Sequence, residues 1–112
     1  MDTTGLLIGR IEGNGLVVVT NCFGYEIPVG KRFTQIIKHQ VTPALPDIHR
    51  IDQGQAATVS LLIEEITLNK LAAPVEAIPE GWSAALMLTG DGVEVLIRIF
   101  QEAGIDEQIF LQ

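Results

Sequence analysis

The stretch from Gly15 to Gly30, GLVVVTNCFGYEIPVG, constrains the fold more than any other part of the chain. Residues 16–19 are apolar and mostly β-branched without alternation, which favours a strand covered on both sides or entering a barrel. Asn21 and Gly24 then supply residues that tolerate turn conformations. The pattern predicts one strand, a kink and a second strand.

The second strand, YEIPV at residues 25–29, alternates apolar and other residues, which indicates one buried face. Its predicted inward residues are Tyr25, Ile27 and Val29. Pro28 has no N–H to donate to a ladder, so an edge or a bulge is expected here. We also expect a strand within KRFTQIIK, residues 31–38.

Residues 39–56 contain Pro43, Pro46 and Gly54 and are predicted to be a long connection without an element of its own. The next segment, ATVSLLIEEITL, changes its apolar parity at Glu64 and Glu65. This change predicts a β-bulge or a sharp bend, which carries a strand round a barrel corner.

WSAALMLTG, residues 82–90, is predicted to be a further strand. It places four residues on one buried face: Trp82, Ala84, Leu86 and Leu88. A helix is predicted next, begun by a capping box of Asp91 and Glu94 and ended by Gly104 in the left-handed conformation. Its apolar stripe is Val93, Leu96, Ile97 and Phe100. The terminal DEQIFLQ either docks as a last strand or pairs with another chain.

These elements predict a mainly β fold: a small closed or partly open β-barrel with one C-terminal α-helix. We expect a single domain over residues 1–112, because a chain of this length supports one core. The barrel should span about 5–90 and the helix about 91–103, with a short tail at 104–112.

The chain is acidic, with a net charge of −7, which argues against broad binding to a phosphate backbone. No apolar run is long enough to cross a bilayer, so no membrane association is expected. Residues 1–15 show no basic segment leading into an apolar stretch, and Cys22 is the one cysteine. A cytoplasmic location with a buried, unreactive thiol is therefore expected.

The opening stretch resembles the start of the second domain of translational GTPases such as elongation factor Tu. The shared pattern is a glycine, a β-branched run, a turn glycine and alternating residues that end in Val-Gly. VSLLIEEITL and IPEGWSAALMLTG resemble the later strands of that domain, one of which ends in Leu-x-Gly. The resemblance covers residues 15–38 and 57–90, and it implies a translation-factor-like barrel.

The family's barrel helps to bind the aminoacylated end of tRNA or contacts the ribosome. No tRNA-contacting residue can be carried over, because the spacing within TNCFGYE differs. The chain also has no G-x-x-x-x-G-K-[ST] phosphate loop, so GTP hydrolysis by that route is excluded. The resemblance therefore bears on the fold more than on the function.

Two sets of residues are candidates for binding. The basic set is Lys31, Arg32, Lys38 and His39, which brings positive charge into a small region of an acidic chain. The aromatic set is Phe23 and Tyr25, near the kink, which are candidates for stacking on a base or packing against a peptide. Phe33 and Trp82 are assigned to the core.

An enzyme would have to use Cys22, His39, His49, Asp47 and Asp52, but no spacing brings these residues together. Two histidines ten apart match no zinc signature, so neither catalysis nor a metal or other cofactor is expected. The leading hypothesis is a non-catalytic module that binds a protein partner and self-associates through an edge strand or the C-terminal tail. The alternative is an RNA-end or ribosome-associated accessory factor that uses residues 31–39.

Overall fold

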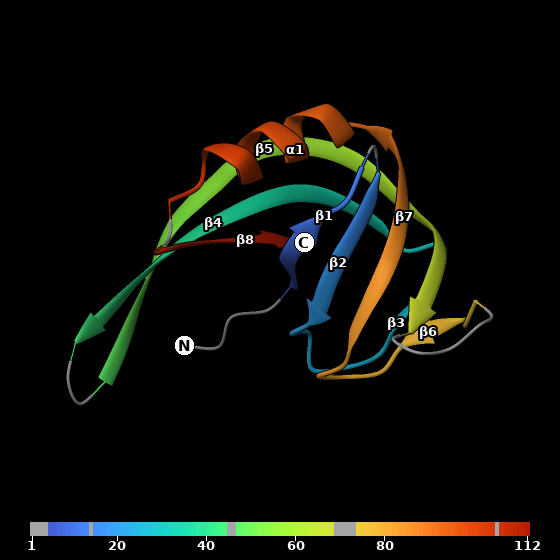
Figure 1. The fold of residues 1–112 in the computed structure, drawn as a ribbon, viewed down its shortest axis with the longest axis horizontal. Coiled ribbons are helices and arrows are strands. Elements are labelled where there is room, and N and C mark those ends of the chain that lie inside the picture. Colours follow the sequence, from blue (N-terminus) through green and yellow to red (C-terminus); the bar gives the residue numbers. More distant parts are fainter. Residues whose placement is uncertain (1–4, 14, 45–46, 69–73, 105) are drawn as a thin grey trace.

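Strands make up most of the described chain (Figure 1). The computed structural model describes residues 5–13, 15–44, 47–68, 74–104 and 106–112, and its description of side chains omits 41–55. The elements in chain order are β1 (Leu6–Ile11), β2 (Leu16–Asn21), β3 (Ile27–Pro28), β4 (Arg32–Ala44), β5 (Asp47–Leu68), β6 (Ala77–Ile78), β7 (Ser83–Asp91), α1 (Val93–Glu102) and β8 (Glu107–Leu111).

Six of these strands form a closed barrel in the order β1-β2-β7-β5-β4-β8, and every neighbouring pair is antiparallel. The predicted class, a mainly β barrel with one C-terminal helix, is confirmed. The segment expected to be a short tail forms β8, which closes the barrel by pairing with β1 on one side and β4 on the other.

The core fills the barrel from all six strands, because alternate residues of each strand point inward. Phe33 is fully buried, as predicted, and Val17, Val19 and Leu86 also face the interior. α1 adds Leu96, which is 1% exposed. The last strand contributes Ile109 and Leu111 to this core, and Phe110 between them is buried as well.

The predicted irregularity at Glu64 and Glu65 is confirmed. The register between β5 and β7 shifts between Ile63 and Glu65, which indicates a bulge. Ile63 and Ile66 are both fully buried although they lie an odd number of residues apart. The shift reconciles these positions with a side-chain period of two.

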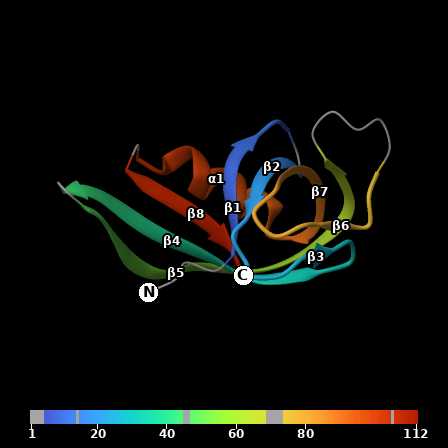
Figure 2. The same ribbon diagram turned by 90° about the horizontal axis from the view of Figure 1, so that it is seen from below.

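The long connection predicted at residues 39–56 is wrong. β4 continues to Ala44 and β5 begins at Asp47, and the two strands pair up to these residues. β4 pairs with β8 as far as Gln40. Beyond Gln40, the pairing described for β4 is with β5. Pro43 fits such a strand because one of its edges needs no ladder donor. The resulting ribbon extends away from the barrel, opposite the small β3–β6 ladder (Figure 2).

Two predicted core faces also need correction. Of the alternating residues in YEIPV, only Ile27 is buried, since Tyr25 is 56% and Val29 is 40% exposed. The reason is that β3 is two residues long and pairs only with β6, so no second layer covers its flanks. The edge position predicted for Pro28 is confirmed. Trp82, assigned to the core with Ala84, is 55% exposed because it precedes the first residue of β7.

The predicted helix is present, but its caps are not the expected ones. Asp91 is the last residue of β7 and pairs with Ser60, so Gly92 is the N-cap, with a φ of 114°. A Cβ at Gly92 would collide with the side chain of Val59. At the other end the C-cap Ala103 is extended, and Gly104 does not have a positive φ.

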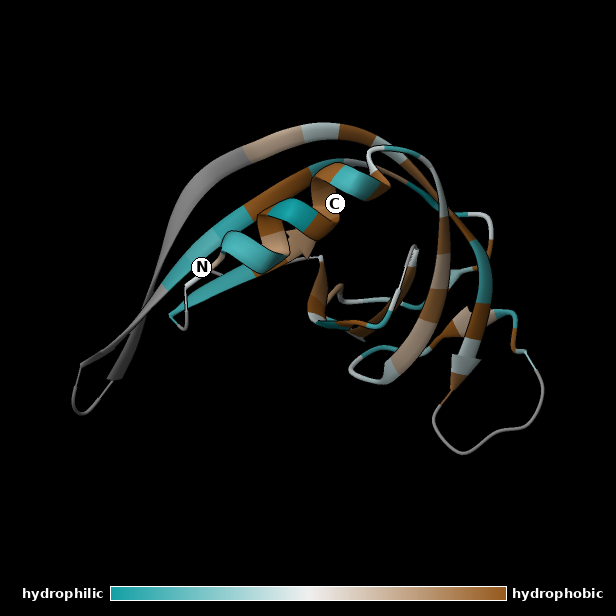
Figure 3. Cartoon of the chain, turned by 45° about the horizontal axis from the view of Figure 1, so that its top comes forward, coloured by the Kyte–Doolittle hydropathy of each residue, from teal (hydrophilic) through white to brown (hydrophobic). Residues whose placement is uncertain are grey.

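The stripe of α1 that packs on the core includes Val95 and Ile99 beside Val93, Leu96 and Phe100. The sequence had predicted Ile97 for this stripe. Figure 3 shows apolar and polar residues alternating along the turns of α1, as expected for a helix with one buried side.

Glu107 connects the end of α1 to the barrel. Its Oε1 accepts a hydrogen bond from the Gly104 N–H at 2.8 Å, and its Oε2 lies 2.8 Å from Lys38 Nζ. The Gly104 hydrogen bond, together with Lys38, lowers the pKa of Glu107 below its ordinary value of 4.5. A lowered carboxyl pKa stabilises the folded state above the unfolded pKa, and this contribution is lost as the pH falls through the folded pKa.

Acidification below pH 4.5 should therefore weaken the attachment of β8 in the native protein. In the Glu107→Gln variant, we expect lower stability at neutral pH and a smaller loss of stability on acidification. Urea unfolding on both sides of pH 4.5 measures both effects. Glu102→Gln, at an exposed carboxyl on α1, serves as the control. Identical pH dependence in wild type and Glu107→Gln would contradict this role.

Candidate binding surface at one end of the barrel

Asn21 joins two loops at the end of the barrel where β2 finishes. It is 1% exposed, and its side-chain NH2 donates hydrogen bonds to the carbonyls of Tyr25 at 2.9 Å, Ile78 at 3.0 Å and Pro79 at 3.3 Å. Its Oδ1 accepts a hydrogen bond from the Phe23 N–H at 2.9 Å. A buried amide with its donors and acceptor in use fixes the local backbone strongly.

Backbone contacts strengthen the same connection. The Asn21 N–H donates to the Trp82 carbonyl at 2.9 Å, and the Gly81 N–H donates to the Asn21 carbonyl at 2.9 Å. The hydroxyls of Thr20 and Ser83 lie 2.8 Å apart across β2 and β7. The segment after β2 and the segment before β7 are therefore joined at one end of the barrel, close to β3 and β6 (Figure 1).

Three large hydrophobic side chains are exposed within the described ranges, and all three belong to this end. They are Tyr25, Val29 and Trp82, which we call the aromatic end. Val29 is held by its N–H, which donates to the Glu76 carbonyl at 2.8 Å. Exposed aromatic side chains on a rigid frame are typical of protein interaction sites.

The buried ring of Phe23 packs against the exposed ring of Tyr25. The Phe23 ring is 8% exposed and lies 5.3 Å from that of Tyr25 and 6.5 Å from that of Phe33, between ring centroids. The Lys31 ammonium lies 5.9 Å from the centre of the Phe23 ring. The aromatic residues predicted as binding candidates are thus adjacent, with Tyr25 outside and Phe23 inside.

The predicted basic set is not gathered on one face in this way. Lys31 lies beside Phe23, and exposed Arg32 donates to the Ser60 hydroxyl at 2.6 Å. Lys38 pairs with Glu107 further along β4. The next residue, His39, is 9% exposed and belongs to the interior.

His39 lies in an unusual polar position. Its ring centroid is 5.1 Å from that of Phe110, and its Nδ1 is buried without a hydrogen-bond partner in the described structure. Gln108 is its cross-strand neighbour on β8, and the Gln108 Oε1 is likewise buried without a hydrogen-bond partner in the described structure. The two residues are paired across β4 and β8, and the burial of His39 keeps it from extending a basic surface.

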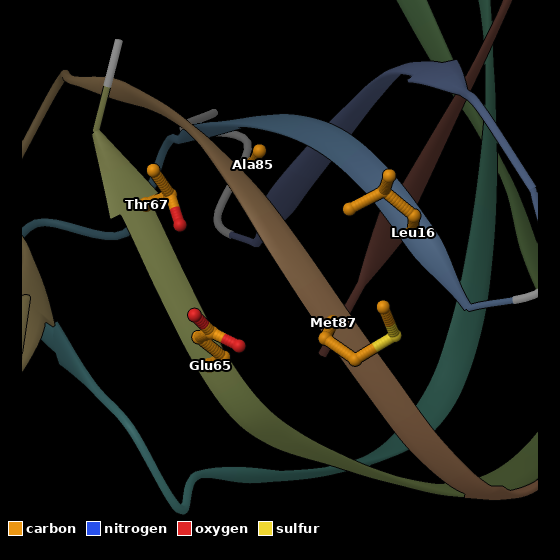
Figure 4. Close-up of a pocket in the computed structure, with 5 residues that line it drawn as sticks. All are labelled: Leu16, Glu65, Thr67, Ala85 and Met87. Carbon is orange, nitrogen blue, oxygen red and sulfur yellow. The ribbon is translucent and has the colours of Figure 1, made fainter. Parts of the chain in front are cut away.

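The outer wall of the barrel has a shallow depression of about 190 Å³ (Figure 4). It spans β2, β5 and β7 and is lined by Leu16, Glu65, Thr67, Ala85 and Met87. Glu65 is its one ionisable lining residue.

Cys22, expected to be buried, is partly exposed. The side chains of Asp47, His49 and Asp52 lie outside the described part of the chain. Among the side chains that are described, no group of three or more His, Cys, Asp or Glu could hold a metal ion. None of the described helices combines the length and apolar character needed to cross a membrane.

The fold and this end together define a small antiparallel β-barrel that carries exposed aromatic side chains on two hydrogen-bonded loops. No protein-family model, curated protein or solved structure matches the chain significantly. The resemblance to the second domain of translational GTPases therefore stays a prediction.

Sequence reasoning missed two contributors to this surface. Asn21 was recognised as a turn residue, but its part in joining two loops depends on carbonyls more than fifty residues away, at Ile78 and Pro79. Trp82 was assigned to the core from its parity with Ala84. The turn residues Pro79 and Gly81 just before it were the available signal that the strand had not yet begun.

Proposed function

We propose that this protein is a small non-catalytic binding module that contacts another protein through the aromatic end. The observation that carries the proposal is the pair of exposed rings, Tyr25 and Trp82, on two loops that Asn21 holds together. Tyrosine and tryptophan contribute much of the binding energy in protein interfaces. A frame that is already ordered lowers the entropic cost of association.

The accessory-factor alternative places an RNA end or the ribosome on residues 31–39. The net charge of −7 opposes it, as do the pairing of Lys38 with Glu107 and the burial of His39. Lys31 remains beside Phe23 at the aromatic end, and Arg32 contacts Ser60 on β5. Binding of RNA is therefore treated as an alternative outcome, which the capture experiment with ribonuclease below distinguishes from binding of a protein.

A second copy of the chain is one candidate for the protein partner. An edge-strand contact would fall on the β4–β5 ribbon beyond Gln40, since β8 is already paired on both sides. Size-exclusion chromatography with light scattering measures this directly. The single cysteine suits a reducing compartment, so we propose a cytoplasmic location.

The proposal is tested by affinity capture from lysate, with and without ribonuclease, followed by identification of the captured proteins. Tyr25→Ser/Trp82→Ser should reduce capture at least about tenfold, because truncated hot-spot residues cost more than ~1.4 kcal/mol. Gln101→Ser, on the exposed side of α1, should leave capture unchanged. The changes at Tyr25 and Trp82 should also leave stability nearly unchanged, since both side chains are exposed.

The RNA alternative makes the opposite prediction. Captured material would then disappear with ribonuclease and with Lys31→Gln/Arg32→Gln, while Tyr25→Ser/Trp82→Ser would retain it. That result would replace the aromatic end with the basic residues as the functional surface.

A further inference from the structure

Three glutamates lie in the segments that form the aromatic end. Glu26 follows Tyr25 directly, Glu80 lies two residues before Trp82, and Glu76 accepts the backbone hydrogen bond of Val29. All three glutamates are exposed. The ion pairs of the described side chains, Arg10–Glu12 and Lys38–Glu107, involve none of them.

The aromatic residues add a second feature that favours a cation. The faces of aromatic rings attract ammonium and guanidinium groups, and tryptophan does so most strongly. Inside the cluster, Phe23 already has such a neighbour in Lys31, at 5.9 Å from the ring centre. The more exposed rings of Tyr25 and Trp82 are presented to an incoming group instead.

Rings and carboxylates select for the same ligand chemistry by different means. Carboxylates attract a positive charge by Coulomb interaction, while ring faces pack against the apolar stem of a lysine or the plane of an arginine. The net charge of −7 also accelerates the approach of a basic partner and repels an acidic one. The charge of this end therefore indicates a positively charged partner, which the exposed apolar area alone would not specify.

We propose that the aromatic end binds a basic segment of a protein partner, whose lysine or arginine side chains pack on Tyr25 and Trp82. The positive charges of the segment are met by Glu26, Glu76 and Glu80. This inference rests on the proposed function and specifies its partner. Arginine should bind more tightly than lysine, because its planar group stacks on rings and bonds carboxylates in pairs.

The first test is titration of the full chain with an oligo-arginine peptide, followed by the fluorescence of Trp82, the one tryptophan in the chain. We expect a saturable change that oligo-lysine produces more weakly and oligo-glutamate does not produce. Affinity should fall as salt is added, because exposed charges are screened. The absence of a saturable change with oligo-arginine would overturn the inference.

Matched charge variants separate this surface from general attraction to an acidic protein. Glu26→Gln/Glu80→Gln should weaken oligo-arginine binding about three- to tenfold, as expected for two exposed charge contacts. Glu94→Gln/Glu102→Gln makes the same charge change on α1 and should leave the affinity nearly unchanged. Equal losses in the two double variants would show that net charge, and not the aromatic end, binds the peptide.

A ring variant tests the aromatic contribution separately. Tyr25→Phe keeps the ring and should retain affinity, whereas Tyr25→Leu should lose about two- to fivefold by calorimetry. Equal affinity of the Leu and Phe variants would contradict a role for the ring.

Lysate capture distinguishes failure of this inference from failure of the proposed function. If Tyr25→Ser/Trp82→Ser abolishes capture but Glu26→Gln/Glu80→Gln does not change it, the aromatic end binds a protein by other chemistry and the basic-segment inference is wrong. If neither variant changes capture, the proposed function is also wrong. Loss in both variants, together with oligo-arginine binding, supports both.

Discussion

Removal of residues 107–112 is expected to abolish cooperative folding of the chain. β8 closes the barrel between β1 and β4, so its loss leaves two unpaired strand edges. It also removes Ile109, Phe110 and Leu111, each at most 1% exposed. At about 1.5–3 kcal/mol for each buried side chain, this loss is comparable with the whole stability of a small domain, about 5–15 kcal/mol.

Thermal and urea unfolding followed by circular dichroism measure the effect. Adding a peptide of residues 104–112 in trans should restore a cooperative transition, whereas a scrambled peptide should not. Gln101→Ala in the full chain provides a surface control, expected within about 0.5 kcal/mol of wild type. A truncated chain that unfolds at the wild-type midpoint would contradict the closure of the barrel by β8.

Asn21→Ala is expected to destabilise the protein by about 2–4 kcal/mol, the second largest effect. The substitution removes the donors from the carbonyls of Tyr25, Ile78 and Pro79 and the acceptor from the Phe23 N–H. Asn21→Asp should be at least as destabilising, because a carboxylate would place negative oxygens against three carbonyls.

Denaturant titration gives the change in stability, and capture at a concentration where the variant is folded gives the change in binding. We expect Asn21→Ala to weaken partner binding although Tyr25 and Trp82 are unchanged, because their frame is no longer held together. Thr20→Val, which removes a hydroxyl on the same strand, should cost less. A loss below about 1 kcal/mol for Asn21→Ala would mean that the backbone contacts hold the two loops without it.

Several elements could be predicted because their signals are local. The β-branched run at residues 16–19 is β2, and the change of parity at Glu64 and Glu65 is the bulge in β5. Helical spacing after Gly90 predicted α1, although the capping residues were wrong. In each case side-chain spacing records which face is buried, and burial is the main force that selects the element.

Other elements became clear only from the strand pairing. The residues after His39 looked like a loop because of their prolines, but pairing of β4 with β5 extends the strand through Pro43 to Ala44. DEQIFLQ left two alternatives open, and its place between β1 and β4 decided between them. Strand pairing across long separations has no signature in a local window.

Some residues of the candidate site could likewise be predicted from local sequence, whereas others depended on tertiary contacts. Phe23 and Tyr25 could be selected from the sequence because they flank the turn glycine in the kink. The exposure of Trp82, the burial of His39 and the function of Asn21 all depend on neighbours from other strands. Exposure belongs to the assembled surface, and no single residue type determines it.

The sequence by itself determined the class of fold, since alternation, glycine-bounded strands and one amphipathic helix are sufficient for a mainly β barrel. Tertiary structure alone decided how the barrel closes and which residues face solvent at its end. The physical reason is that backbone hydrogen bonds in a sheet join partners far apart in the chain. The hydrogen bonds of Asn21 show this most clearly, because they join the segment that holds Tyr25 to the segment that leads into Trp82.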